Sequence, residues 1–415
     1  MRASVTAGKD EVRPSPIGLG EFVALMATMT ALVAASIDMI LPALPAIGSA
    51  LGAGRANDNQ LVISFLFFGF GLGQLFFGPL SDNTGRKPAV YVGLGFYISG
   101  CLLALLSQTY SMMLTGRFLQ GLGVAGPRAM TIALVRDKFE GRSMARVMSL
   151  IMTVFIMVPV IAPTLGQAVL SISGWRTIFG IYLTMAIVAC LWFGLRQEET
   201  LSVDRRIPFS LERILGAVRE VFASRLAFGC TMAAGFIFGA FLGYLNSAQQ
   251  ILQQLYGLGP RFPQYFAVLA IALGLASFSN ARLVMRHGMH RLSVWSLRAV
   301  CGLSIVFLGV SLALSGHPPL WAFMTYMMLS FFGIGLLFSN LNALAMQPLG
   351  HIAGTGAAVV GALSTLTSLA LGTLIGQSYN DTVLPLVTGF AILSVLSMLT
   401  LRWAESGEGV KTESL

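Results

Sequence analysis

The feature that most constrains this chain is a succession of apolar stretches, each long enough to cross a lipid bilayer as one helix. The stretches fall at roughly 21–40, 60–79, 89–107, 112–135, 146–170 and 176–195, and then at 226–250, 263–285, 293–315, 320–345, 354–377 and 382–402. A transmembrane helix needs about 20 mostly apolar residues. Only 10% of the residues are charged and 55% are hydrophobic, which excludes a water-soluble globular protein. The sequence therefore predicts an all-α integral membrane protein with twelve transmembrane helices in two sets of six.

The positions of the basic residues predict how these helices are oriented. The chain has 26 Lys and Arg and a net charge of +9. With both termini in the cytoplasm, the outside holds Arg55, Arg176 and Arg261, and Arg117 and Arg128 lie within a span. Subtracting these five from 26 leaves 21 basic residues on the inside, where loops of membrane proteins carry their positive charge. The excess charge thus indicates topology and argues against a nucleic-acid partner.

The spans divide the chain into two bundles joined by a polar segment. We expect a cytoplasmic tail at 1–20, a first six-helix bundle at 21–195, a cytoplasmic linker at 196–225, a second bundle at 226–402 and a cytoplasmic tail at 403–415. Within the linker, Leu211, Ile214, Leu215, Val218 and Phe222 share one face at helical spacing. This pattern predicts an amphipathic helix lying on the cytoplasmic membrane surface.

The two bundles carry a weak internal repeat. The loop after the second span reads GPLSDNTGRKP (78–88), and the loop after the eighth reads ARLVMRHGMHRL (281–292), so that Gly85 corresponds to Gly288. Matching loops in two six-helix halves are typical of a parallel repeat about an axis along the membrane normal.

Four motifs in the first half carry a resemblance to a known family. GPLSDNTGRKP resembles the signature between helices 2 and 3 of the major facilitator superfamily. SIDMILPALPAIGSALG (36–52), RFLQGLGVAGPRAM with LVRD (117–137), and VPVIAPTLGQAV with GWRTIF (158–179) resemble the drug/proton antiporters of its bicyclomycin-resistance (Bcr/CflA) branch. The resemblance implies the major facilitator fold, a bacterial inner-membrane location and multidrug efflux driven by the proton gradient. It is clear over residues 36–180.

The family motifs suggest roles for two groups of residues. By resemblance, a cytoplasmic charge network latches the outward-facing state; its residues are Gly78, Asp82, Gly85, Arg86, Lys87 and Asp137. The alternative is that these charges only hold a solvated loop. In the fifth span, Pro159, Pro163 and Gly166 resemble the antiporter signature, although Ala162 stands where many members have Gly. Two prolines four residues apart bend a helix, so antiport and a merely bent helix both remain open.

Asp38 and Arg117 are predicted at similar depths near the outer ends of the first and fourth spans. Asp38 is the only carboxylate well inside a predicted span, and an unpaired charge there costs several kcal/mol. We therefore expect pairing across helices or exposure to a watery cavity. A static ion pair is one interpretation; the other is proton coupling, in which Asp38 gains and loses a proton and Arg117 responds.

Further polar residues are candidates for a substrate cavity. Arg128 follows Arg117 by eleven residues, which returns it to within about 20° of the same helix face and roughly 16 Å deeper. Together with Gln120 and Val124, Arg128 is a candidate for the wall of the cavity, and its positive charge would favour zwitterionic, neutral polar or anionic substrates. The alternative is that Arg128 snorkels toward the cytoplasm. The remaining candidates are neutral amides that either line the cavity or bond neighbouring helices. These are Asn246, Gln249, Gln253, Asn340 and Asn342.

The function that the sequence favours is a proton-coupled exporter of drug-like or amphiphilic small molecules that works by alternating access. The alternative is an exporter, exchanger or uptake carrier of an endogenous zwitterionic or anionic metabolite or a siderophore-like compound. A membrane enzyme is a remote alternative, because the four histidines fall in loops or at helix ends and no catalytic cluster appears in the spans. We expect a small-molecule substrate, protons and lipid as partners, no cofactor or metal, no catalytic residues, and a functional monomer.

Overall fold

The structure is a computed structural model that describes residues 17–406. Every regular element in this part of the chain is a helix. Eleven segments within it are long and apolar enough to cross a membrane, and the longest, Leu320–Gln377, contains two helices. Counting those two separately gives twelve, which confirms the predicted all-α membrane fold.

Each half contributes six long helices. Those of the first half are α1 (Leu19–Asp38), α3 (Leu61–Thr84), α4 (Arg86–Leu105), α5 (Tyr110–Lys138), α6 (Gly141–Ser173) and α7 (Trp175–Arg196). Those of the second half are α9 (Arg225–Ala248), α10 (Phe262–His287), α11 (Met289–Ala313), α12 (Leu320–Met346), α13 (Ala353–Gln377) and α14 (Leu384–Glu405). The predicted tails at 1–20 and 403–415 lie largely outside the described residues.

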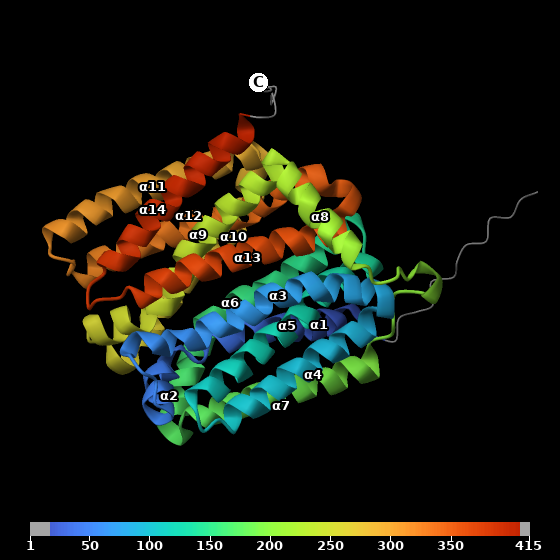
Figure 1. Cartoon of the computed structure of the whole chain (residues 1–415), viewed down its shortest axis with the longest axis horizontal. Helices are drawn as coiled ribbons and strands as arrows, with labels where there is room; N and C mark the ends of the chain where they lie inside the picture. Colours follow the sequence, from blue (N-terminus) through green and yellow to red (C-terminus); the bar gives the residue numbers. More distant parts are fainter. Residues whose placement is uncertain (1–16, 407–415) are drawn as a thin grey trace, which may run out of the picture.

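Short helices connect these elements. They are η1 (Leu41–Ala43), α2 (Leu44–Leu51), η2 (Ala56–Gln60), η3 (Val203–Arg205), α8 (Leu211–Ala223), the π-helix η4 (Gln249–Leu255), η5 (Gly259–Arg261) and η6 (Gln347–Ile352). Figure 1 shows the two halves side by side, with the linker and α8 at one end and α2 at the other. We call these the linker end and the distal end. Across the interface, α3 packs against α13 and α6 against α10.

Small residues let α3 and α5 approach closely in the first half. A Cβ at Gly121 would overlap the backbone carbonyl of Leu66, and a Cβ at Gly69 would overlap that of Phe118. Hydrophobic burial gives little drive for association in lipid, so such close backbone contact stabilises helix pairs there. This packing fixes α5, which carries Arg117, directly against α3.

The linker forms the predicted amphipathic helix, α8. Ser210 caps its N-terminus by accepting a hydrogen bond from the Arg213 amide at 3.2 Å. Ile214, Ala217 and Val221 are buried, whereas Leu211 and Phe222 are exposed. The helix thus packs on the protein through one stripe and leaves an apolar stripe uncovered beside it.

Candidate functional site

The first element of the site is the C-terminal end of α1, where Asp38 lies. A helix that continued past Asp38 would need an N–H at position 42 for the Asp38 carbonyl, but residue 42 is a proline and has none. The helix therefore ends at Asp38 and begins again as η1. Ending a helix leaves its last carbonyls without partners in the helix. The Asp38 side chain is 5% exposed.

Arg117 of α5 supplies the missing partner for one of these carbonyls. Its guanidinium is fully buried and donates from Nη2 to the Ser36 carbonyl at 2.7 Å. It also donates from Nε to the Val62 carbonyl at 2.9 Å and from Nη1 to Gln120 Oε1 at 2.7 Å. One cation thus joins α1, α3 and α5. All three acceptors are neutral, and the partial negative charge of the α1 C-terminus favours a cation there.

The structure brings Asp38 and Arg117 to the same helix end without an ion pair between them. Within residues 17–406, the Asp38 carboxylate has no hydrogen-bond or ion-pair partner, and Arg117 binds the carbonyl two residues earlier. Tyr182 of α7 and Tyr244 of α9 belong to the same hydrophobic core as this helix end. Tyr244 belongs to the second half, and its buried hydroxyl also lacks a partner in the described structure.

Several residues of this cluster were not predicted. Ser36 Oγ and Tyr97 Oη are 2.5 Å apart, and Tyr182 Oη donates to the Ala35 carbonyl at 2.9 Å. Gln120, a predicted cavity residue, donates instead to Cys101 Sγ at 3.2 Å while accepting from Arg117. Ser36 lies two residues from Asp38 in a recognised motif, which is a usable signal. The tyrosines come from other helices, so the motif did not indicate them.

The antiporter-like motif of α6 lies against the same helix end. Pro159 and Pro163 both lie inside a helix that runs unbroken from Gly141 to Ser173. A Cβ at Gly166 would overlap the Met39 carbonyl, the residue after Asp38. Gly166 therefore allows α6 to touch the point where α1 ends, and this contact helps to fix the position of Asp38.

Replacing Gly166 by alanine should displace α6 from the end of α1. Overpacking of this kind costs about 1–3 kcal/mol, so we expect a lower melting temperature and reduced transport in proteoliposomes. Gly180→Ala is the matched control, because no heavy atom lies within 4 Å of the added Cβ there. Equal melting temperatures and rates in Gly166→Ala and Gly180→Ala would remove the proposed role of this contact.

The other predicted cavity residues of α5 separate in space. Val124 is fully buried in the hydrophobic core. Arg128 is half-buried, and its guanidinium lies 4.9 Å from the centre of the Phe155 ring on α6. Within the described residues it makes no hydrogen bond or ion pair. Arg128 is therefore a cation held by an aromatic face, with its donors available to a ligand.

The predicted amides of the second half divide between two roles. Asn340 bonds neighbouring helices, because its Nδ2 donates to Asn280 Oδ1 of α10 at 2.8 Å. Asn342 donates to the Phe338 carbonyl of its own helix at 2.8 Å. Gln249 donates to Gln253 at 2.8 Å within η4. Of the five, only Asn246 bonds across the halves, donating to Ser64 Oγ of α3 at 3.3 Å.

Asn246 belongs to a larger set of polar contacts that joins the two halves at the distal end. We call this set the distal clasp; its residues are Asn57, Gln60, Ser64, Asn246, Gln250, Thr373, Gln377 and Tyr379. Asn57 is central: its Nδ2 donates to the Gln377 carbonyl at 3.0 Å and to the Tyr379 carbonyl at 2.9 Å, and its Oδ1 accepts from Gln250 at 2.8 Å. Gln60 also donates to Gln250. The residues of the clasp are uncharged, and Arg55 beside them adds one contact across the halves, from Nη2 to Gln377 Oε1 at 3.5 Å. Together these contacts hold the two halves together at the distal end.

The predicted charge network lies at the linker end, within the first half. Arg86 contacts two carboxylates, Asp82 at 2.6 Å through Nη1 and Asp137 at 3.1 Å through Nε. Asp137 also accepts from Thr200 Oγ1 of the linker at 2.8 Å. Gly85 adopts a φ of 110°, which favours glycine. The network therefore ties α3, α4, α5 and the linker together, and within residues 17–406 none of these bonds reaches the second half.

Glu199 of the linker is a functional residue that no local sequence pattern indicates. Its two carboxylate oxygens accept the backbone amides of Arg86 and Lys87 at 2.9 Å each. These amides are the first of α4, where a helix has unsatisfied donors and a partial positive charge. The linker residue thus caps the helix that begins with the Gly-Arg-Lys motif. Its position 113 residues after Arg86 explains why no local pattern indicated it.

Comparisons with known proteins agree with this architecture. Residues 26–376 match the family model described as Major Facilitator Superfamily. The chain is 28% identical over 368 residues to an uncharacterised MFS-type transporter, YdgK, of Bacillus subtilis, covering 88% of this chain and 90% of that protein. It is 27% identical over 401 residues to a bicyclomycin resistance protein homolog of Haemophilus influenzae, covering 93% and 96%.

A solved structure shares the fold. The human organic anion transporter MFSD10 superimposes with a TM-score of 0.68 at 16% identity, covering 94% of this chain and all of that one. This likeness concerns the arrangement of the helices alone.

Proposed function

The chain belongs to the major facilitator superfamily, so it is a multi-pass membrane transporter and not an enzyme, and we propose that it exports small molecules in exchange for protons. The observation that carries the proposal is the buried, unpartnered carboxylate of Asp38 at the end of α1. A charged carboxylate in a membrane span costs about 2.5–3.5 kcal/mol even by the lower estimates. Binding a proton removes that cost, so Asp38 is a natural proton carrier.

Arg117 provides a way to couple the proton to the helices. With Asp38 protonated, Arg117 binds the Ser36 carbonyl and two acceptors on α3 and α5. When Asp38 loses its proton, the new negative charge attracts the guanidinium more strongly than a neutral carbonyl does. Movement of Arg117 toward Asp38 would keep α5 bound to α1 but would release the Val62 carbonyl, and so would loosen α3 from the other two helices. The end of α1 also contacts α6 through Gly166, so a movement of the α1 end would be passed on to α6.

Alternating access requires a gate at each end, and the structure supplies a candidate for one state. The distal clasp closes the distal end, so a substrate would enter from the linker end. The positive-inside pattern supports a cytoplasmic linker end, so in our proposal opening of this end gives the inward-facing state. In this scheme both termini are cytoplasmic, the membrane is the bacterial inner membrane, and the proton gradient drives export by a monomer without a cofactor.

The substrate class follows from the charges within the spans. Arg128 has free donors, and Asp38 is neutral when protonated, so the transport path carries net positive charge in that state. This favours zwitterionic, neutral polar or anionic compounds over lipophilic cations. The bicyclomycin resistance homolog supports export of drug-like compounds. An endogenous zwitterionic or anionic metabolite is the second candidate, and the unpaired Arg128 is the observation that favours it.

The proposal is tested in proteoliposomes with an imposed pH gradient and a panel of anionic, zwitterionic, neutral and cationic compounds. We expect transport of at least one compound to depend on the pH gradient. In Arg128→Ala, transport of anions and zwitterions should fall by about tenfold or more, because one charge-assisted contact is lost. Arg136→Ala, at the linker end of the same helix, is the control. Gradient-independent transport would contradict antiport, and faster transport of a lipophilic cation than of any anion or zwitterion would contradict the proposed charge preference.

A further inference from the structure

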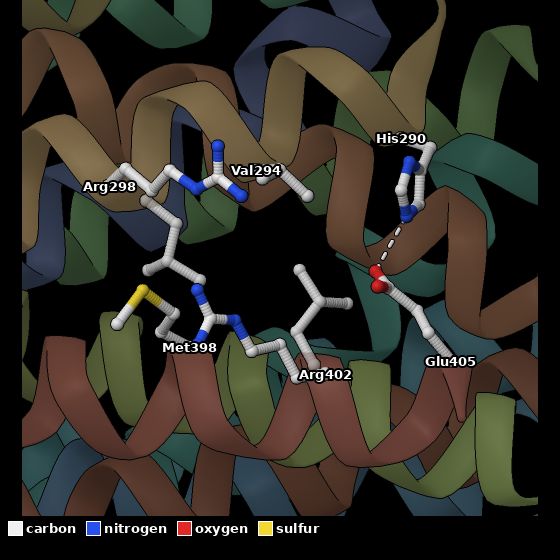
Figure 2. Close-up of a pocket in the computed structure, with 8 residues that line it drawn as sticks. His290, Val294, Arg298, Met398, Arg402 and Glu405 are labelled. Carbon is white, nitrogen blue, oxygen red and sulfur yellow. Dashed lines mark hydrogen bonds and ion pairs between the residues drawn. The ribbon is translucent and has the colours of Figure 1, made fainter. Parts of the chain in front are cut away.

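A second site candidate lies on the outer face of the second half, away from the interface between the halves. A cavity of about 150 Å³ opens between α11 and α14 near the linker end. Its lining includes Arg298 and His290 from α11 and Arg402 and Glu405 from α14. Figure 2 shows both arginines reaching into the space between the two helices, with His290 and Glu405 at one side.

The side chains that line this cavity do not balance the positive charge of its two arginines. Glu405 Oε1 lies 2.6 Å from His290 Nε2, so the one carboxylate of the cavity already has a partner. Arg298 and Arg402 make no hydrogen bond or ion pair with any residue in 17–406, and both are exposed. Two guanidinium groups with free donors on facing helices form a geometry suited to a phosphate, which accepts several N–H bonds at once.

A separate apolar groove lies farther along the same two helices. It is lined by Ile305 of α11 and by Ala391, Ile392, Val395 and Leu396 of α14, with no polar surface. Ile305 follows Arg298 by seven residues and Val395 precedes Arg402 by seven, so both lie about 10 Å from the arginines along their helices. Because α11 and α14 run in opposite directions, both displacements point toward the distal end, into the hydrocarbon region.

We propose that the cavity and the groove together bind one anionic phospholipid, with its phosphate on Arg298 and Arg402 and an acyl chain along Ile305 and Val395. A free phosphate would use the arginines alone and leave the groove unexplained. Basic pockets between transmembrane helices bind lipid headgroups in this way. Trp295 and Trp403 are 51% and 44% exposed on the same helices, as expected for residues at the headgroup level.

The test is native mass spectrometry of the full-length protein released from nanodiscs of phosphatidylglycerol and phosphatidylcholine. We expect retained phosphatidylglycerol in the wild type and a fall in apparent affinity of about tenfold or more in Arg298→Gln/Arg402→Gln, since each arginine near an anionic surface contributes a factor of about five. Arg282→Gln/Arg286→Gln removes the same charge from the linker end of α10, which lies outside the cavity. This control should retain the lipid.

Two further arms distinguish the source of the phosphate. Inorganic phosphate and glycerol phosphate at millimolar concentration should neither displace the lipid nor raise the melting temperature. Stabilisation by these soluble anions equal to that by phosphatidylglycerol would overturn the lipid proposal in favour of a free-anion site. Unchanged lipid retention in the Arg298/Arg402 variant, or an equal loss in the Arg282/Arg286 variant, would also overturn it.

Discussion

Asp38→Asn should abolish transport driven by a pH gradient while leaving a folded protein. Asparagine has nearly the same shape as aspartic acid, but its side chain does not titrate, so the site stays neutral at every pH used for transport. Its neutral form also avoids the cost of a buried unpartnered carboxylate, and we expect an unchanged or higher melting temperature. In proteoliposomes, gradient-driven flux should fall to the level of vesicles without protein, and the remaining substrate exchange should lose its pH dependence.

The control for this variant is Glu21→Gln, in the same helix. Glu21 lies near the linker end of α1, where its Oε1 pairs with Arg196 Nε at 2.6 Å. It is therefore a structural carboxylate with a cation partner, and its loss should leave the pH dependence of transport unchanged. Two results would contradict the role of Asp38: a wild-type pH profile in Asp38→Asn, or loss of the pH profile in Glu21→Gln. A variant that lost substrate binding as well would point to Asp38 as a substrate contact.

The fold was predictable because its signal is local and repeated. A span forms a helix across the membrane if its own residues are apolar over a sufficient length, because all spans are surrounded by the same lipid. The positions of the helices follow the apolar stretches closely; α14, for example, extends three residues beyond the predicted end at 402. The linker helix was predictable for the same reason, since its apolar residues recur at helical spacing.

The partners within the site were not predictable in the same way. The sequence predicts that Asp38 and Arg117 lie at similar depths, with a static ion pair as one interpretation and proton coupling as the other. The structure shows that Arg117 bonds the Ser36 carbonyl, in the last turn of α1, where the end of the helix leaves carbonyls without helical partners. Every residue type has a backbone carbonyl, so the identity of a residue does not indicate whether its carbonyl accepts a side-chain hydrogen bond. Similarly, Gln120 was predicted to face a cavity, yet Arg117 and Cys101 take up its hydrogen bonds.

The residues of the distal clasp are far apart in the sequence. Asn57 and Gln60 lie in a short loop helix, and Gln250 and Gln377 lie nearly two hundred or more residues later, so only the folded chain brings them together. Neutral amides are weak signals because they occur on many surfaces. Each of their hydrogen bonds contributes about 0.5–1.5 kcal/mol. Together these bonds can hold the two halves in contact, and each bond is weak enough to break when the halves move apart. Burial raises the pKa of Tyr379 to about 12, so its hydroxyl stays neutral at the pH values of transport.

A disulfide across the clasp should stop transport reversibly. Ser64 Oγ of α3 and Thr373 Oγ1 of α13 are 2.8 Å apart, which brings their Cβ atoms close to the separation that a disulfide requires. In Ser64→Cys/Thr373→Cys, oxidation would hold the distal end closed, and alternating access requires that end to open once in every cycle. We therefore expect flux to fall at least tenfold on oxidation, to about background, and to recover on reduction.

The single variants Ser64→Cys and Thr373→Cys and the oxidised wild type separate this effect from side reactions. The wild type keeps Cys101, Cys190, Cys230 and Cys301, so any inhibition through native thiols would appear there as well. Non-reducing gel mobility or peptide mapping reports whether the cross-link has formed. Full transport by a completely cross-linked double variant would show that the distal end need not open, and the clasp would then be a permanent contact between the halves. Inhibition confined to the cross-linked protein and relieved by reductant would identify the clasp as the gate that the cycle must break.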